Sequence, residues 1–231
     1  MKNHLKRPIA PKTWNLLRKT DKFVARPHPG AHSFEHGVPL IVLFRDMINT
    51  VHNAKEAKYM LTKYSVMVDG RKRKDVKHII GLMDTVSLPD MKQNFRIILN
   101  HEGKLDTVAI DEKESKVKAC KITGKKMNGK KIQLTTHDGR TILVDSRDYN
   151  TGDTIIIELP SQKVTEHFKL EPKMTVYLVG GKHAGSIGHI ENVEKNKLSY
   201  KSKDGHVFET LKEYAFVIGK AKPAITIMKE N

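Results

Sequence analysis

Cysteine is almost absent from this sequence, since Cys120 is the only one in 231 residues. A disulfide framework is therefore excluded, and a reducing compartment is the simplest setting. Long apolar runs are missing too: the longest, Val38–Phe44, falls far short of the ~20 residues of a membrane span. The N-terminus also lacks the apolar core of a signal peptide. These absences predict a soluble, cytoplasmic protein that has no membrane partner.

Aromatic and acidic residues are scarce as well. Aromatics make up 6% of the chain, which argues against a single-strand binder that stacks base after base. Asp and Glu number 26 against 42 Lys and Arg, for a formal net charge of +16. Self-repulsion of that size destabilises a compact free protein, so a polyanionic partner is expected. Nucleic acid fits better than an anionic membrane, because no amphipathic helix collects the basic residues.

Residues 1–37 form a basic segment rich in proline and glycine. Four prolines, from Pro8 to Pro29, rule out a continuous helix. The segment has few apolar residues, so we expect it to be an extension that buries too little to fold alone. We therefore predict that it is disordered without its partner, although Trp14 indicates that part of it docks against an apolar surface.

Residues 38–100 begin with two predicted helices. Apolar side chains from Leu40 to Ile48 recur at helical spacing, which is typical of an amphipathic helix. Asn53 followed by Glu56 has the spacing of a capping box, so a second helix is expected to begin there.

A basic hairpin follows the two helices. The stretch 65–68 predicts a strand, Asp69-Gly70 a tight turn, and Arg71–Lys74 are four consecutive basic residues. Two helices followed by such a hairpin are typical of a small RNA-binding module found in ribosomal proteins, pseudouridine synthases and some tRNA synthetases. A solvated charged hairpin is the usual alternative for a charge run. The net charge and the preceding helices favour RNA binding here.

The pattern beyond Phe95 is mostly β. Short apolar runs are separated by turn signals at Glu102-Gly103 and His137–Arg140, and by an expected basic loop over Lys125–Lys131. Strands at this spacing predict a small barrel-like central domain over residues 101–172.

Residues 173–219 have the glycine spacing of a KOW motif, known from ribosomal proteins and transcription elongation factors. Gly180, Gly181, Gly185 and Gly188 follow an alternating apolar strand, and such glycines allow a positive φ and close backbone approach to RNA or protein. We expect a five-stranded SH3-like barrel here. A basic tail is expected over 220–231. The predicted fold class is therefore α+β, mainly β.

Three strings resemble catalytic or metal-binding motifs. Gly103–Asp106 is similar to the motif that carries the catalytic Asp of pseudouridine synthases, but Lys104 replaces its Arg and a hairpin turn is the favoured interpretation. His32–His36 has the spacing of a zinc-protease string, yet glycine and proline on both sides prevent the helix that this chemistry needs. Cys120 has no His or Asp arrangement typical of a nucleophile, so we expect it on a strand facing a small core.

The order of these parts resembles the archaeal and eukaryotic S-four-e family of small-subunit ribosomal proteins over essentially the whole chain. The matching stretches are His4–Arg7, Ala10–Lys12 with Trp14, Arg26-Pro27, Leu40–Arg45, Val68–Gly70, Gly81–Asp84, Asn94–Arg96, Thr136–Asp138, Arg140–Ile142, Gly180-Gly181, Gly185, Ile187-Gly188 and Phe216–Gly219. The short C-terminal region is similar to the archaeal form. The resemblance implies a structural constituent of the small subunit that binds rRNA and neighbouring ribosomal proteins, with no catalytic residues, metal, cofactor or small-molecule substrate.

The candidate RNA-binding residues are the basic, histidine and tryptophan side chains of these segments. They are Lys2, His4, Lys6, Arg7, Lys12, Trp14, Arg18, Lys19, Arg26, Arg45, Lys55, Lys58, Arg71, Lys72, Arg73, Lys74, Lys125, Lys126, Lys130, Lys131, Lys182 and His183. Two alternatives stay open: an RNA-modifying enzyme with a fused RNA module, and a transcription or translation factor that binds protein through the KOW barrel.

Overall fold

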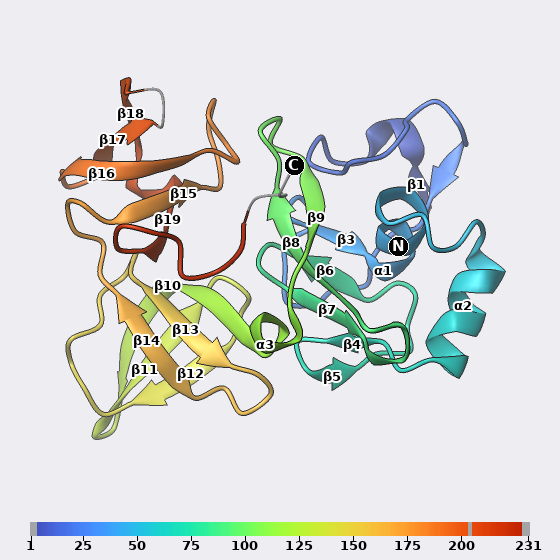
Figure 1. Ribbon diagram of the computed structural model, residues 1–231, viewed down its shortest axis with the longest axis horizontal. Helices are drawn as coiled ribbons and strands as arrows, with labels where there is room; N and C mark the ends of the chain where they lie inside the picture. The colour runs from blue at the N-terminus through green and yellow to red at the C-terminus, as the bar shows by residue number, and fades with distance from the viewer. Residues whose placement is uncertain (1–3, 203–204, 228–231) are drawn as a thin grey trace. The chain divides into compact units, whose positions relative to one another are not determined.

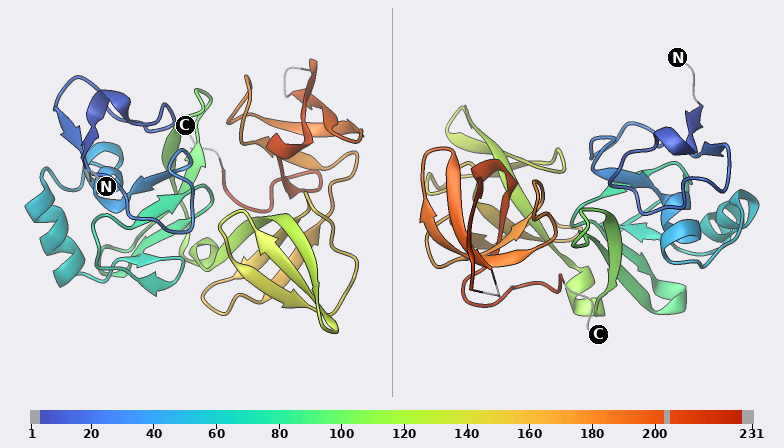
Figure 2. Two further views of the ribbon diagram at one scale, coloured as in Figure 1. Left: turned by 180° about the vertical axis from the view of Figure 1, so that it is seen from behind. Right: turned by 90° about the horizontal axis from the view of Figure 1, so that it is seen from above.

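The computed structural model describes residues 4–202 and 205–227, which form two compact units. Of these residues, unit 1 contains 4–98 and 104–116, and unit 2 contains 99–103 and 117–227. Figures 1 and 2 show that strands dominate and helices are few, which confirms the mainly β class. No helix in the described ranges is long and apolar enough to cross a membrane. The boundaries of the five segments expected from the sequence are finer than these two units, and they stay predictions.

Unit 1 is built from short strands and helices. In chain order they are β1 (Leu5–Lys6), η1 (Arg7–Ile9), β2 (Phe23–Val24), β3 (Gly37–Pro39), α1 (Leu40–Val42), η2 (Leu43–Met47), α2 (Ala54–Lys63), β4 (Met67–Val68), β5 (Arg71–Lys72), β6 (Ile79–Gly81), β7 (Thr85–Leu88), η3 (Pro89–Met91), β8 (Gln93–Leu99), β9 (Leu105–Ala109) and α3 (Glu112–Ser115). The main sheet has the order β5-β4-β7-β8-β9, and β1 with β2 and β3 with β6 form two small pairs. Leu99, the last residue of β8, belongs to unit 2.

The two predicted helices are present, with a different geometry in the first. One α-helical turn, α1, continues as the π-helix η2, whose wider winding is closed by the Ile48 amide donating to the Leu43 carbonyl at 2.9 Å. Every residue from Leu40 to Phe44 is buried, so this is a core element rather than an amphipathic surface helix. The second helix, α2, begins where the sequence predicts, because the Asn53 side chain accepts from the first-turn amides.

The N-terminal segment differs from the prediction that it buries too little to fold. Trp14 is 1% exposed, and Ala10 and Val24 are also buried. The Thr13 carbonyl accepts from the Leu105 amide at 2.7 Å, which ties the segment to β9. The expectation that the segment buries too little is therefore wrong for residues 4–37, because one large aromatic ring and two small apolar residues supply the burial, whereas its disorder without a partner stays a prediction.

Unit 2 consists of two antiparallel five-stranded sheets. Its elements are β10 (Val117–Asn128), β11 (Lys131–Thr136), β12 (Thr141–Val144), β13 (Thr154–Glu158), β14 (Val164–Phe168), β15 (Thr175–Leu178), β16 (Ile187–Val193), β17 (Lys197–Ser202), β18 (Val207–Leu211), η4 (Lys212–Tyr214) and β19 (Ala215–Gly219). The first sheet has the order β12-β11-β10-β13-β14, and the second β18-β17-β16-β15-β19. The five strands expected in the KOW-like region are present, and closure into a barrel stays a prediction.

Strand β13 is shared by two hydrophobic cores. Ile155 and Ile157 pack with Cys120 in a core of the first sheet, while Ile156 belongs to the core of the second. A strand buried on both faces needs a continuous apolar run rather than alternation, which explains the sequence of β13. The predicted placement of Cys120 on a core-facing strand is confirmed.

One segment of unit 2 differs from its prediction, and a second has buried residues that the prediction did not include. The expected basic loop over Lys125–Lys131 is mostly strand, because β10 runs to Asn128 and pairs there with Lys131 at the start of β11. The expected basic tail contains the buried residues Ile225 and Ile227, each 4% exposed. It is also tied to β19, where the Ile218 carbonyl accepts from the Ala224 amide at 2.8 Å. Residues 228–231 lie outside the described part.

Candidate nucleic-acid interface

The basic hairpin of unit 1 is held by a tight turn between β4 and β5. Asp69 and Gly70 both have positive φ, 49° and 71°, which is the type I′ geometry that matches the strand twist. The Asp69 carboxylate accepts from the Thr85 amide at 3.0 Å, and the Asp69 amide donates back to the Thr85 carbonyl at 2.9 Å. This reciprocal pair pins the turn to β7, so the hairpin presents its side chains from a fixed support.

The four basic residues after this turn keep their charge uncompensated. Arg71, Lys72 and Lys74 are exposed, and Arg73 is half-buried. The Arg73 amide donates to the Val66 carbonyl at 2.9 Å, which continues the hairpin beyond β5. In the described residues, no carboxylate lies within ion-pair distance of any of the four. They form the densest run of unpaired positive charge in unit 1.

Helix α2 carries lysines on the face away from the core. Ala57, Met60 and Leu61 are buried, while Lys55 and Lys58 are exposed. Beyond the end of the helix, the Lys72 ammonium donates to the Ser65 hydroxyl at 3.0 Å, which links the β5 strand to the end of α2. The hairpin is therefore attached to the end of α2 by a side-chain hydrogen bond as well as by the chain itself.

Arg7 and Arg45 serve the fold rather than a surface. Arg7 is 3% exposed, and its guanidinium pairs with Asp46 at 2.7 Å and donates to the Leu17 carbonyl. Arg45 pairs with the same carboxylate at 2.8 Å. Trp14 is buried as well. An internal ion pair thus occupies Arg7 and the core encloses Trp14, while their contact with RNA stays a prediction.

The other candidates of the N-terminal segment vary in availability. The Arg18 guanidinium donates to the carbonyls of Ala10 at 2.6 Å and Pro11 at 2.7 Å, so it ties the segment together. The exposed candidates are His4, Lys6, Lys12, Lys19 and Arg26. His4 packs on the exposed ring of Phe23 with the centroids 5.5 Å apart. Lys2 lies outside the described residues.

In unit 2, the β10–β11 hairpin holds four candidate lysines. Lys126 and Lys130 are exposed and have no ion-pair partner within the described ranges. The Lys125 ammonium donates to the carbonyls of Arg147 at 2.9 Å and Tyr149 at 2.7 Å, and Lys131 lies 3.5 Å from the Asp145 carboxylate. Half of this set is therefore committed to contacts within the protein.

The glycines of the KOW-like motif make close contacts within unit 2. A Cβ on Gly185 would lie 2.0 Å from the Asn100 carbonyl oxygen, and this glycine has φ +83°. Beside it, Lys182 is exposed, while His183 is half-buried and packs on Phe208 with the ring centroids 4.4 Å apart. Gly185 is therefore required for packing, and Lys182 alone is fully available to a ligand.

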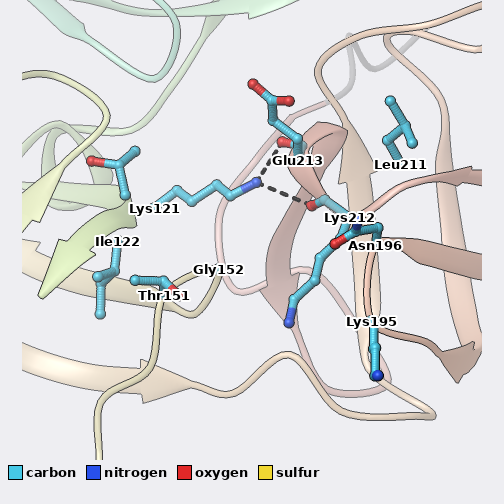
Figure 3. Close-up of a pocket in the computed structure, with 10 residues that line it drawn as sticks. Lys121, Ile122, Thr151, Gly152, Lys195, Asn196, Leu211, Lys212 and Glu213 are labelled. Carbon is cyan, nitrogen blue, oxygen red and sulfur yellow. Dashed lines mark hydrogen bonds between the residues drawn. The ribbon is translucent and has the colours of Figure 1, made fainter.

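A pocket of ≈ 650 Å³ in unit 2 brings together three lysines that the sequence did not single out (Figure 3). Lys121 comes from β10, Lys195 from the turn between β16 and β17, and Lys212 from η4. The Lys121 ammonium is buried and donates to the Glu213 and Ala215 carbonyls, both at 2.6 Å. Burial lowers the pKa of Lys121 to about 8, although the nearby Glu213 carboxylate raises it.

The charge of this pocket comes from its two outer lysines. Neither Lys195 nor Lys212 has an ion-pair partner among residues 4–202 and 205–227. Figure 3 shows the Glu213 carboxylate and the Lys212 ammonium pointing in opposite directions. Hydroxyl and amide groups of Thr151 and Asn196 also line the pocket. Its composition suits an oxyanion such as a phosphate.

A buried polar cluster in the first sheet of unit 2 has the spacing of metal ligands but the wrong charge. Ligand atoms of Cys120, His137 and Asp138 lie within 4.8 Å of one another. Asp138 is paired with buried Lys118 at 2.8 Å and with Arg140 at 2.9 Å. Burial alone would raise the pKa of the Asp138 carboxyl, but the Lys118 ammonium holds it well below its usual range. With two cations already on this carboxylate, the cluster is an internal ion network.

The fold and the charge distribution define a class: small antiparallel β modules with uncompensated basic hairpins, an arrangement suited to binding structured RNA. A protein-family model described as ribosomal family S4e matches residues 91–164, and a second family model, described as RS4NT domain, matches residues 1–35. The small ribosomal subunit protein eS4 of Methanocella arvoryzae is 40% identical over 98% of both chains, and that of Methanocaldococcus jannaschii is 39% identical over the same shares. The chain belongs to the S4e family of ribosomal proteins, which confirms the archaeal-type resemblance.

The solved structures agree with this assignment. The crystal structure of the 30S ribosomal protein S4e from Thermoplasma acidophilum matches with a TM-score of 0.71 and 27% sequence identity. The match covers 84% of this chain and 99% of that chain. The mainly β fold of this chain is therefore consistent with that of the S4e family.

Sequence reasoning missed the lysine pocket of unit 2 for a physical reason. Lys121 and Lys212 are 91 positions apart in the chain, so only the tertiary fold brings them together. Lys195 and Asn196 stand between two apolar runs, a turn signal that was available in the sequence, but a turn alone does not specify its neighbours.

Proposed function

We propose that this chain is a structural constituent of the small ribosomal subunit that binds small-subunit rRNA, mainly through lysine and arginine contacts to phosphates. In that role it supports subunit assembly and translation, at the ribosome in the cytoplasm, beside neighbouring ribosomal proteins. The named relatives are small-subunit proteins, and their family is structural rather than enzymatic, which supports a role without catalysis.

The observation that carries this proposal is the uncompensated run Arg71–Lys74 on a hairpin fixed by its type I′ turn. Unpaired surface cations destabilise the folded chain through mutual repulsion. When they contact phosphates, the release of counterions favours binding. Arginine suits this place because its planar guanidinium can hold two phosphate oxygens. Lys55 and Lys58 on α2 extend the same positive segment.

Unit 2 supplies a second set of proposed contacts. Lys126 and Lys130 lie on the β10–β11 hairpin, and Lys195 and Lys212 line the pocket of Figure 3. Each of these four is unpaired within the described residues, so each can contribute to a salt-dependent affinity. Binding through both units predicts that neither alone reaches the affinity of the whole chain.

The direct test is sedimentation with small subunits isolated from an archaeal relative. The intact chain should stay with the small-subunit peak through a wash at high salt, and the large-subunit peak should lack it. A variant in which Arg71, Arg73, Lys195 and Lys212 are alanine should be released at lower salt. A wild-type chain that leaves the subunit at moderate salt, or sediments equally with both subunits, would refute the proposal.

A further inference from the structure

A smaller pocket in unit 1 has the size and the mixed lining of a small-molecule site. It has a volume of ≈ 390 Å³ and lies between the segment 26–34 and strand β6. Its apolar lining includes Pro27, Pro29 and Ile79, its aromatic lining Phe34 and His28, and Lys77 adds a positive charge. Small-molecule sites in proteins have volumes of roughly 300–1,000 Å³ and this same mixture of apolar walls with a few polar groups.

The pocket is held by contacts that do not need a ligand. The His28 amide donates to the Lys77 carbonyl at 3.0 Å, which fixes one wall against the other. Beneath, the buried ring of His32 pairs with the Asp84 carboxylate at 2.9 Å. Gly30 lies so close to the floor that a Cβ there would stand 2.4 Å from Ile79 Cγ2. The walls are therefore preorganised.

The exposed rings in this pocket are available for stacking. The Phe34 side chain is 39% exposed although one side of it contacts Trp14, with the centroids 5.6 Å apart. His28 is 59% exposed, and its Nε2 lies 3.6 Å from the Asp75 carboxylate. Aromatic rings beside an open apolar cavity are the means by which proteins hold unstacked bases of single-stranded RNA.

The charge of the pocket selects an anionic ligand. Lys77 has no ion-pair partner in the described residues, and Arg26 also lines the pocket. A ligand that is flat and apolar at one end and anionic at the other satisfies both parts of the lining. A metal ion is not supported in the same way, because in the described residues the side chains of this pocket do not bring three metal-ligand atoms together.

We propose that this pocket binds one unstacked nucleotide of RNA, with the base against Phe34 and His28 and the phosphate beside Lys77. The proposal rests on the proposed function and deepens it by assigning a base contact to a protein otherwise expected to read phosphates. The low aromatic content of the chain agrees with a single extruded base rather than a stacked series.

The first experiment uses free nucleotides with the full chain. AMP and CMP should give saturable NMR shifts of the Phe34 and His28 ring resonances, and inorganic phosphate should not move the Phe34 ring. The Lys77→Gln variant, which leaves the apolar floor intact, should weaken AMP binding. Equal responses to AMP and inorganic phosphate would reduce the pocket to an anion site and overturn the proposal.

The second experiment uses a small-subunit rRNA fragment at several salt concentrations. Phe34→Leu should weaken binding roughly fivefold or more, the effect of losing one base stack, without changing the salt slope. Phe23→Leu is the matched control, since Phe23 is an exposed aromatic residue of the same segment outside this pocket. Amide spectra of both variants should match the parent chain.

The outcomes separate this proposal from the wider function. If Phe34→Leu binds the fragment as tightly as Phe23→Leu does, the pocket does not bind a nucleotide of this RNA, and the proposal is overturned. A response to AMP would then indicate a site for free nucleotides. Such a result leaves rRNA binding through the basic hairpin intact. A fragment that the parent chain itself does not bind would instead overturn the proposed function.

Discussion

The basic hairpin permits a quantitative test of electrostatic binding. Changing Arg71 and Arg73 together to alanine removes two positive charges that no carboxylate neutralises in the described residues. Arg71 lies on the two-residue strand β5 and is exposed, so its removal should not affect the core. Arg73 is half-buried and holds its backbone bond to Val66 through the amide, which alanine retains. Folding should therefore change little.

The expected magnitude follows from counterion release. Removing one cation that touches a phosphate lowers the slope of log affinity against log salt by roughly 0.7 to 0.9. The double variant should lower it by about 1.5 if both guanidinium groups touch phosphates, and by about 0.8 if only the exposed Arg71 does. If the slope changes by 1.5, raising the salt from about 50 to 200 mM weakens the binding of the variant roughly eightfold less than that of the parent.

Two matched variants make the assay specific. Lys116 and Lys197 are each already paired with a carboxylate, at 3.0 and 3.4 Å, so their double alanine variant removes the same charge with little effect on the slope. Arg71→Lys with Arg73→Lys keeps the charge, and should keep the slope while lowering affinity if the contacts are bidentate. Binding of an rRNA fragment across a salt series measures all three. A double alanine variant with unchanged slope and unchanged affinity would mean that the basic run is a solvated face and that other segments bind.

Four further predictions address the fold and the excluded chemistry. The pKa of Lys121 is about 8 in the folded chain against 10.5 unfolded, so the unfolded chain binds more protons between these values, and the free energy of unfolding of the parent chain relative to Lys121→Met should rise by about 3 kcal/mol from pH 8 to 10.5 in denaturant titrations. Tyr177→Phe should cost about 2 kcal/mol by the same measurement, because its hydroxyl both donates to and accepts from the backbone of Leu99 at 2.7 Å. Trp14→Ala should cost about 3–5 kcal/mol, and the amide protection of the N-terminal segment should fall with it; fast exchange of that segment in the parent chain would contradict the structure. Asp106→Asn should leave the pseudouridine content of cellular rRNA unchanged, and loss of one specific pseudouridine would support an enzyme instead.

The features that the sequence predicted well are those fixed by local chemistry. Asn53 caps α2 because its side chain reaches the amides two and three positions later, and no distant residue is involved. Asp69-Gly70 forms its turn because the hairpin requires two consecutive positive φ angles. Local rules of this kind hold in nearly any tertiary setting, so they can be applied before the fold is known.

The features that it predicted poorly depend on distant partners. In the sequence, Arg7 is an ordinary basic residue of a proline-rich segment. Only the fold pairs it with Asp46, which is 39 positions away. Ile225 and Ile227 stand within a basic stretch, and their burial becomes apparent only in the fold. The candidate site divides in the same way: composition predicted a basic surface for RNA, and the tertiary pairing decides which cations remain exposed on it.

The distribution of acidic residues connects the fold to the proposed interface. Three of the buried cations have an acidic partner: Arg7 pairs with Asp46, Arg96 with Glu114 at 3.0 Å, and Lys118 with Asp138 at 2.8 Å. Removing the acidic partner of a buried cation costs about 3–5 kcal/mol, so these carboxylates stabilise the fold. Acids used in the interior cannot neutralise the surface. The excess positive charge of the described residues therefore lies mainly on exposed side chains. Removing an internal acid, as in Asp46→Asn, should then destabilise the fold while leaving the salt slope of RNA binding unchanged, whereas removing surface arginines should do the reverse.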